Sequence, residues 1–144
     1  MVSVIMGLKG AGKTKQLIHL VNENVNKADG VIVVLEHGPK LTYDINHGAR
    51  LIDTVPYEIK SYQVLRGFIT GLYAGNYDLN QVFIDSLFKI SGSGDMLECE
   101  RFLGWCERFG EVNGIDFTIT VSARVEDATE GMKKYLTQVS GFAC

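Results

Sequence analysis

Short apolar runs recur along the chain and predict the strands of a sheet. Residues 31–35 (VIVVL) contain no polar position, which is typical of a strand buried on both faces. Residues 2–6, 81–86 and 115–122 are also rich in β-branched and aromatic residues, and residues 50–55 form a shorter candidate strand. These segments predict a sheet whose central strands are buried.

Segments with apolar residues every three or four positions alternate with these runs and predict helices. The first helix is expected over residues 15–21, with an apolar face that extends to Val25, while the second and third follow Ser61 and Asp95, which are suitable N-caps. A short fourth helix is expected over residues 132–139. The predicted apolar faces consist of Leu17, Ile18, Val21 and Val25, then Val64, Leu65, Phe68, Ile69 and Leu72, and finally Cys99, Phe102, Leu103, Cys106 and Phe109.

A glycine-rich stretch joins the first strand to the first helix. Residues 7–14 (GLKGAGKT) form a complete G-x-x-x-x-G-K-T phosphate-binding loop in the strand–loop–helix context that this motif requires. Glycines let successive backbone N–H groups point into one concavity, and the positive end of the helix adds to the field. Lys13 is expected to reach the β- and γ-phosphates, and the Thr14 hydroxyl to bind Mg²⁺. The predicted nucleotide-binding residues are Gly7, Leu8, Lys9, Gly10, Ala11, Gly12, Lys13, Thr14 and Lys15.

The alternation of strands and helices predicts one α/β domain over residues 1–144, with right-handed crossovers and a mainly parallel central sheet. Ligands of such sheets bind beyond the carboxyl ends of the strands. The phosphate loop, Glu36, Asp85 and residues 122–124 all lie at the carboxyl ends of predicted strands. We therefore expect these polar groups to meet at one edge of the sheet.

Two acidic residues are candidates for the chemistry of this site. Asp85 ends an apolar strand and is expected to help bind Mg²⁺ together with Thr14. Many ATP hydrolases place a catalytic Glu directly after this Asp, but here the next residue is Ser86. Glu36, at the end of a neighbouring strand, is the candidate substitute that would hold water in line with the γ-phosphate. The alternative for Glu36 is a solvated acid at a strand end.

Composition narrows the classes of partner and compartment. The net charge of −3 argues against a protein that coats nucleic acid, although it leaves room for a local basic loop. No targeting segment is evident, and no apolar run approaches the roughly 20 residues needed to cross a bilayer. The three cysteines form no paired framework, which suits a reducing compartment. We therefore expect a cytoplasmic protein.

Three stretches together resemble the RecA-like family of P-loop ATPases over roughly residues 1–124: GLKGAGKT, VIVVLEHGPKLTYDI and QVFIDSLFKIS. The resemblance implies a three-layer α/β/α P-loop NTPase fold with a RecA-like strand order. It implies ATP as the ligand, Mg²⁺ positioned by Thr14 and Asp85, and Glu36 as the catalytic base. It also implies a polar sensor after the last strand, where this chain has Ser122 and Arg124.

Arg124 is a candidate arginine finger toward a neighbouring subunit or a sensor within its own chain, and a surface arginine is the alternative. In this family the loops after the Asp strand and after the last strand face DNA or another polymer. The corresponding residues 91–95 and 125–131 are not basic here. We therefore do not expect this chain to share the filament formation and DNA binding of the family.

Three functions are consistent with these features. The first is a Mg²⁺-dependent ATPase coupled to an unknown partner, which is either another protein or further copies of the chain in a homo-oligomer. The second is a nucleotide-dependent switch or scaffold with little hydrolysis, suggested by the missing acid after Asp85. The third is a small-molecule kinase resembling thymidine kinase. The absence of an Asn-Lys-x-Asp guanine signature favours ATP over GTP.

Overall fold

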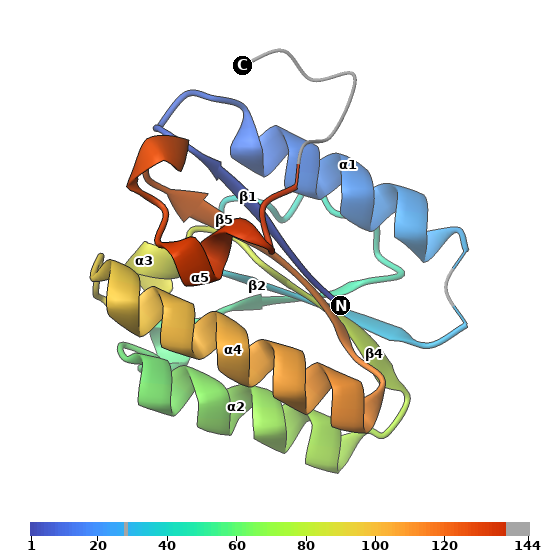
Figure 1. Cartoon of the computed structure of the whole chain (residues 1–144). Helices are drawn as coiled ribbons and strands as arrows, with labels where there is room; N and C mark the ends of the chain where they lie inside the picture. The colour runs from blue at the N-terminus through green and yellow to red at the C-terminus, as the bar shows by residue number, and fades with distance from the viewer. Residues whose placement is uncertain (28, 138–144) are drawn as a thin grey trace.

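Parallel strands form the centre of the protein. The computed structural model describes residues 1–27 and 29–137. Its sheet has the order β1-β5-β4-β2-β3, and all four ladders are parallel (Figure 1). The prediction of a mainly parallel sheet is therefore confirmed. The strands are β1 (Val2–Gly7), β2 (Val31–Glu36), β3 (Arg50–Asp53), β4 (Leu79–Ile84) and β5 (Asp116–Ser122).

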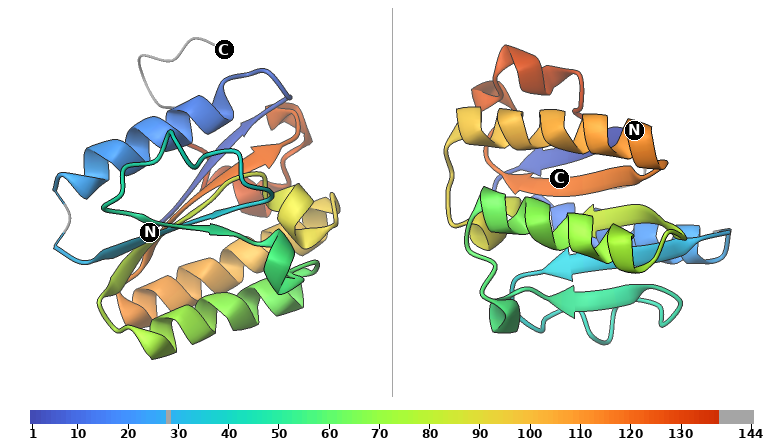
Figure 2. Two further views of the ribbon diagram at one scale, coloured as in Figure 1. Left: turned by 180° about the vertical axis from the view of Figure 1, so that it is seen from behind. Right: turned by 90° about the horizontal axis from the view of Figure 1, so that it is seen from below.

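Helices cover both faces of this sheet. Helix α1 (Lys13–Val25) lies on one face, and α2 (Tyr62–Gly75) and α4 (Met96–Asn113) lie on the other (Figure 2). Two short helices, α3 (Leu87–Ser91) and α5 (Glu130–Lys133), follow β4 and β5. This arrangement is compatible with the three-layer α/β/α fold that the sequence predicts. Short 3₁₀ segments occupy Val55–Tyr57 and Val125–Asp127.

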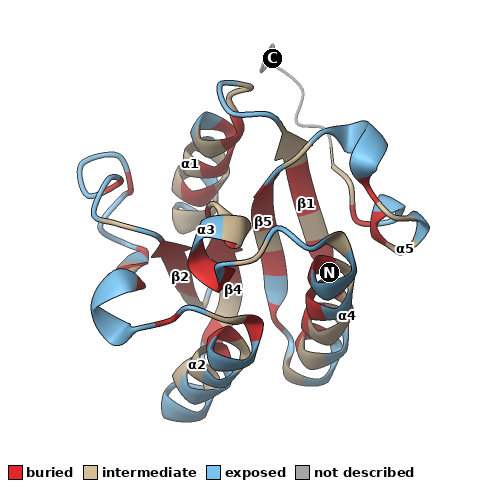
Figure 3. Cartoon of the chain, turned by 90° about the vertical axis from the view of Figure 1, so that its left-hand side faces the viewer, coloured by how far each residue is buried: buried red, intermediate tan, exposed pale blue. Residues whose placement is uncertain are grey.

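The buried apolar side chains form two clusters, one on each face of the sheet. The smaller cluster includes Leu17 of α1, and the larger includes Leu65 of α2 and Phe102 of α4. Figure 3 shows the buried positions along the strands and on the sheet-facing sides of the helices. Strand β2 contributes to both clusters, because side chains alternate between faces along a strand: Ile32 and Val34 join the smaller cluster, and Val33 and Leu35 join the larger.

The predicted helix starts are confirmed by their hydrogen bonds. The Ser61 hydroxyl accepts from the Val64 backbone N–H at 3.1 Å. One carboxylate oxygen of Asp95 accepts from the backbone N–H groups of Leu97 and Glu98 at 2.9 and 3.0 Å. These contacts satisfy amides that the first turn of a helix leaves without an intrahelical partner.

The predicted apolar face of the second helix needs one correction. Val64 is 46% exposed, whereas Leu65 and Ile69 are fully buried and Tyr62 is 8% exposed. The buried stripe is therefore rotated toward Tyr62. The sequence pattern placed two adjacent apolar residues on one face, and only packing against the sheet decides which of them faces inward.

The prediction of a helix over residues 132–139 is confirmed only at residues 132 and 133 and was wrong for residues 134–137. Helix α5 ends at Lys133, and Leu136 instead pairs with Val4 in a parallel bridge. The Val4 N–H donates to the Tyr135 carbonyl at 2.7 Å, and its carbonyl accepts from the Thr137 N–H at 2.9 Å. Residues 135–137 pair with the edge of β1 because the backbone N–H and C=O groups of an edge strand need hydrogen-bond partners. Residues 138 and 139 lie outside the described residues.

No helix within residues 1–27 and 29–137 combines the length and the apolar character needed to cross a bilayer.

The cap of α4 leads to a test of stability. Replacing Asp95 with alanine removes the acceptor for two amides, so the free energy of unfolding should fall by about 1 kcal/mol. Urea unfolding monitored by circular dichroism measures the change. Glu111→Ala is the matched control, since it removes the same charge from an exposed position on the same helix. Equal stabilities of the two variants would contradict this role for Asp95.

Candidate functional site

The phosphate loop has a backbone that requires glycine. Gly10 and Gly12 have φ values of +90° and +84°, which are strained for residues with a side chain. A Cβ atom at either position would meet nothing within 4 Å, so the space beside the loop is open. Helix α1 then begins at Lys13 without a side-chain cap. The loop thus presents an open concavity at a helix N-terminus, which is the setting in which backbone N–H groups bind anions.

Lys13 lies over this loop. Its side chain is 7% exposed, and its ammonium group donates to the Leu8 carbonyl at 3.0 Å. The positive charge is therefore held within the loop and next to the concavity.

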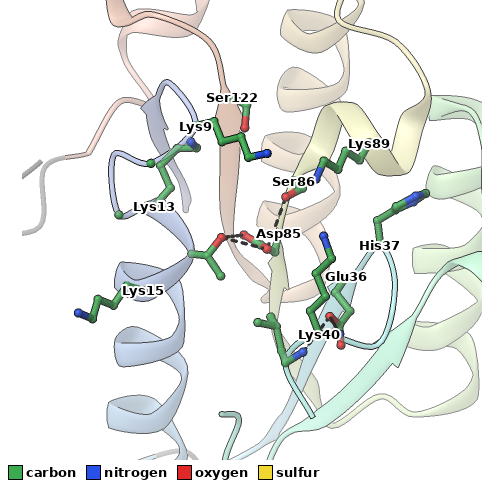
Figure 4. Close-up of a pocket in the computed structure, with 14 residues that line it drawn as sticks. Lys9, Lys13, Lys15, Glu36, His37, Lys40, Asp85, Ser86, Lys89 and Ser122 are labelled. Atoms are coloured by element: carbon green, nitrogen blue, oxygen red, sulfur yellow. Dashed lines mark hydrogen bonds between the residues drawn. The ribbon is translucent and has the colours of Figure 1, made fainter. Parts of the chain in front are cut away.

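Asp85 follows β4 and links the phosphate loop to the sheet. The Thr14 hydroxyl oxygen lies 3.1 and 3.2 Å from the two carboxylate oxygens of Asp85 (Figure 4). From β5, the Thr120 hydroxyl donates to Asp85 Oδ1 at 2.8 Å. The Asp85 backbone N–H also donates to the Leu35 carbonyl of β2 at 2.9 Å. The carboxylate is 7% exposed and is held by residues from α1 and β5.

Ser86 turns the chain immediately after this aspartate. It has a φ of +61°, a conformation that non-glycine residues seldom adopt. Its backbone N–H donates to the Thr120 hydroxyl at 2.7 Å, and its side chain lies 3.5 Å from Asp85 Oδ2. The Thr120 hydroxyl therefore both accepts from Ser86 and donates to Asp85, and it stabilises the turn that leads into α3.

Thr14 and Asp85 together fit a magnesium ion. Mg²⁺ prefers hard oxygen ligands and is typically bound through one or two protein groups, several waters and substrate phosphates. The hydroxyl and carboxylate of these two residues are oxygen donors that lie beside the phosphate loop. Among the described residues, no three His, Cys, Asp or Glu side chains form a cluster that would hold a metal ion. A metal here would therefore depend on ligands from a phosphate group.

Glu36 ends β2 on the other side of Asp85. One of its carboxylate oxygens accepts from the backbone N–H groups of Lys40 and Leu41 at 2.9 and 3.1 Å, so the following loop folds back over it. The residue is only 3% exposed. Burial raises the pKa of this carboxyl above its ordinary value, the two backbone hydrogen bonds oppose that effect, and the charges of Asp53 and Asp85 add to it. Glu36 is therefore a buried carboxyl with an elevated pKa, and the alternative of a solvated acid is excluded.

These groups border one cavity with a volume of about 530 Å³. Side chains from the phosphate loop, the loop after β2, and α3 surround it (Figure 4). Its lining consists of Lys9, Gly10, Gly12, Lys13, Thr14, Lys15, Glu36, His37, Lys40, Leu41, Asp85, Ser86, Lys89 and Ser122.

The structure brings most of the predicted site residues to this cavity, but it places Arg124 elsewhere. Arg124 is absent from the lining, and it forms a two-point ion pair with Asp127 at 3.1 Å. Leu8 points to solvent with 57% of its surface exposed, and Gly7 and Ala11 shape the loop without lining the cavity. Lys15 contributes to the lining, although its side chain points away from Asp85 in Figure 4.

Sequence reasoning missed three residues at this site. Thr120 is a polar residue in a strand that is otherwise apolar at its buried positions, and this contrast is the signal that would have found it. Lys89 lies three residues after Ser86, a spacing that shares one helix face only if the segment is helical. The sequence around Lys40 does not indicate that this residue lies at the site, because its position depends on how its loop folds over Glu36.

A scan against models of protein families gives no match for this chain, and a search of curated proteins gives none either.

The hydroxyl of Thr120 leads to a second test of stability. Thr120→Val keeps the shape of the side chain but leaves the Ser86 N–H without its acceptor and removes one of the donors to Asp85, so unfolding should become easier by about 1–3 kcal/mol. Chemical denaturation measures the change. Thr118→Val is the control on the same strand, because the Thr118 hydroxyl makes no hydrogen bond within the described residues. An equal effect of the two substitutions would argue against the Thr120 network.

The elevated pKa of Glu36 leads to a prediction about pH. A carboxyl whose pKa is higher in the folded protein favours folding most at low pH, and this contribution is lost as the pH rises through the folded pKa. Glu36→Gln, which keeps an acceptor oxygen, should therefore raise the free energy of unfolding at neutral pH relative to the wild type. The gain should shrink as the pH falls toward the ordinary pKa of glutamate. Denaturation curves across this pH range, with Glu111→Gln as control, provide the measurement. A gain that does not vary with pH would contradict the prediction.

Proposed function

We propose that this chain binds ATP with Mg²⁺ and hydrolyses it as a RecA-like P-loop ATPase, coupling hydrolysis to work on a partner. One observation carries the proposal. Thr14 and Asp85 are 71 positions apart in the sequence, yet their side chains meet at 3.1 Å beside the open glycine loop. This is the pairing that nucleotide-binding P-loop proteins use to position magnesium. A glycine-rich turn with an unrelated role would not need it.

The proposal includes a RecA-like strand order. In its support, β5 lies between β1 and β4, so one strand separates the phosphate loop from Asp85. Thr120 of that strand then reaches Asp85 directly. The all-parallel sheet also brings the carboxyl ends of β1, β4 and β2 to one edge, where ligands of such sheets bind.

The loop amides and Lys13 bind the phosphates of the nucleotide. The loop amides and the N-terminus of α1 provide a positive field, and the Lys13 ammonium exchanges its contact with the Leu8 carbonyl for phosphate oxygens. Thr14 and Asp85 would hold the magnesium ion, which when bound neutralises the charge that develops on the phosphates. Thr120 keeps the Asp85 carboxylate oriented toward Thr14.

Glu36 is the proposed base. Its backbone hydrogen bonds to Lys40 and Leu41 hold the carboxyl at the edge of the cavity. A raised pKa makes the ionised carboxylate a stronger base, which suits a group that accepts a proton from water. Ser86, which occupies the position after Asp85, has a hydroxyl and no carboxyl, so Glu36 is the acid available for this role at the cavity.

A nucleotide-dependent switch with little hydrolysis is the second candidate. The observation that favours it is the ion pair between Arg124 and Asp127, since an arginine held in this way is not directed at the cavity. For Arg124 to act as a finger in a neighbouring subunit, this pair would have to break. The absence of an acidic residue directly after Asp85 also agrees with a nucleotide-dependent switch.

The proposal places the protein in the cytoplasm. Cys99 and Cys106, the two cysteines among the described residues, are free and buried, as expected for a protein of a reducing compartment.

Phosphate release from Mg-ATP tests the proposed activity. Lys13→Ala should weaken ATP binding by about tenfold or more, because it removes a charge-assisted contact, and turnover should be lost. Glu36→Gln should keep ATP affinity and lower kcat by about 10²–10⁴-fold, as expected for the loss of a general base. A phosphate-release assay and calorimetric titration measure the two quantities separately.

Lys60→Ala is the control for charge, since Lys60 is exposed and does not line the cavity. ATP binding without turnover in the wild type would favour the switch. Full turnover in Glu36→Gln would remove Glu36 from the mechanism, and failure of the wild type to bind ATP would overturn the proposal.

A further inference from the structure

The cavity holds two lysines that the phosphate loop does not supply. Lys40 comes from the loop after β2, and Lys89 comes from α3. Both are exposed, and neither ammonium group has a hydrogen bond or ion pair among the described residues. The two acidic side chains of the cavity, Glu36 and Asp85, accept hydrogen bonds from other groups and form no ion pair with either of these lysines. The positive charge of these lysines is therefore available to a ligand.

Hydrogen bonds from two consecutive backbone N–H groups hold the backbone at Lys40 in place. Its N–H donates to a carboxylate oxygen of Glu36 at 2.9 Å, and the next N–H, of Leu41, donates to the same oxygen at 3.1 Å. The Leu41 side chain is 5% exposed and packs into the core cluster beneath α1. The loop is thus anchored to the candidate base, and the Lys40 side chain extends from this anchor beside Glu36 (Figure 4).

Lys89 is directed to the cavity by the turn at Ser86. The positive φ of Ser86 begins α3, and the Lys89 N–H donates to the Ser86 carbonyl at 3.0 Å. Leu87 and Ile90 are fully buried on the inner face of this helix. Ser86 and Lys89 both line the cavity, and Figure 4 shows Lys89 reaching across from α3 toward the side where Lys9 lies.

The charge of the cavity contrasts with that of the whole chain. The protein carries a net charge of −3. The lining nonetheless contains five lysines and only two acidic residues. Lys15 points away from Asp85, and the other four are Lys9, Lys13, Lys40 and Lys89. Such a local excess of positive charge in a concave site raises the affinity for anions. Two of the four come from the wall opposite the phosphate loop, so a bound phosphate chain would meet positive charge on both sides.

We propose that Lys40 and Lys89 bind the terminal phosphate of the nucleotide and supply, from the same chain, the positive charge that RecA-like enzymes obtain from a neighbour's arginine. This inference rests on the proposed function and deepens it. The phosphate loop holds the β- and γ-phosphates from one side, and the two lysines approach from the side where Glu36 holds water. Because Arg124 is paired with Asp127 away from the cavity, these lysines are the cations in place for this task.

Nucleotide affinities test the inference without requiring turnover. Calorimetric titration with Mg-ATP and with Mg-ADP compares ligands that differ by the terminal phosphate. Lys40→Ala and Lys89→Ala should each weaken ATP binding by about tenfold and leave ADP affinity within about twofold. Lys13→Ala should weaken both ligands. Lys40→Arg and Lys89→Arg should recover part of the ATP affinity, and Lys60→Ala should change neither ligand.

Turnover gives a second readout where the wild type hydrolyses ATP. The rate per chain should be independent of protein concentration, and the Lys40→Ala, Lys89→Ala double variant should lose it, because no neighbour contributes to the site. Equal losses of ATP and ADP affinity, or no loss beyond that of Lys60→Ala, would overturn the assignment while leaving the proposed function standing. A wild type that binds neither nucleotide would overturn the proposed function itself, which is a distinct result.

Discussion

The site depends on the buried carboxylate of Asp85. A carboxylate that is 7% exposed is stable only if it is paired with donors or a cation, because burial removes most of its hydration. Here the donors are hydroxyl groups, Thr14 from α1 and Thr120 from β5. These contacts join the first helix, the last strand and the end of β4. They leave the carboxylate next to the phosphate loop, where a metal ion would satisfy it further.

The parallel sheet explains why so few residues build a complete site. All five strands run in the same direction, so the residues that follow them meet at one edge although they are far apart in the sequence. Glu36 ends a buried strand at this edge, and Asp85 and the phosphate loop each follow one. The apolar clusters on both faces hold the strands rigidly, and rigid strands position polar side chains more accurately than loops would.

At the same edge of the sheet, the acidic and the basic side chains differ in whether they have partners within the protein. Asp85 and Glu36 both accept hydrogen bonds from donors of the protein, while the ammonium groups of Lys40 and Lys89 have no acceptor among the described residues. No ion pair joins either acid to these lysines within the described residues, so their ammonium groups remain able to attract an anion. Arg124 is the opposite case, because Asp127, three residues away, satisfies it locally. Arg124 thus pairs within its own turn, whereas Lys40 and Lys89 come from two separate elements and line the cavity.

Much of this molecule was determined by its sequence alone. The apolar runs predicted the strands, Ser61 and Asp95 predicted helix starts, and the spacing GLKGAGKT predicted a loop that only glycines permit at positions 10 and 12. These features are local, so the residues that cause them lie next to one another in the chain.

Long-range contacts decided the rest. Residues 135–137 pair with β1 because an edge strand needs partners for its backbone, and no local pattern shows this. Thr120, Lys40 and Lys89 reach the cavity because neighbouring strands and a fold-back loop place them there. The sequence by itself thus determined the elements and the phosphate loop, whereas the tertiary structure decided which side chains surround it, since that depends on which strands become neighbours.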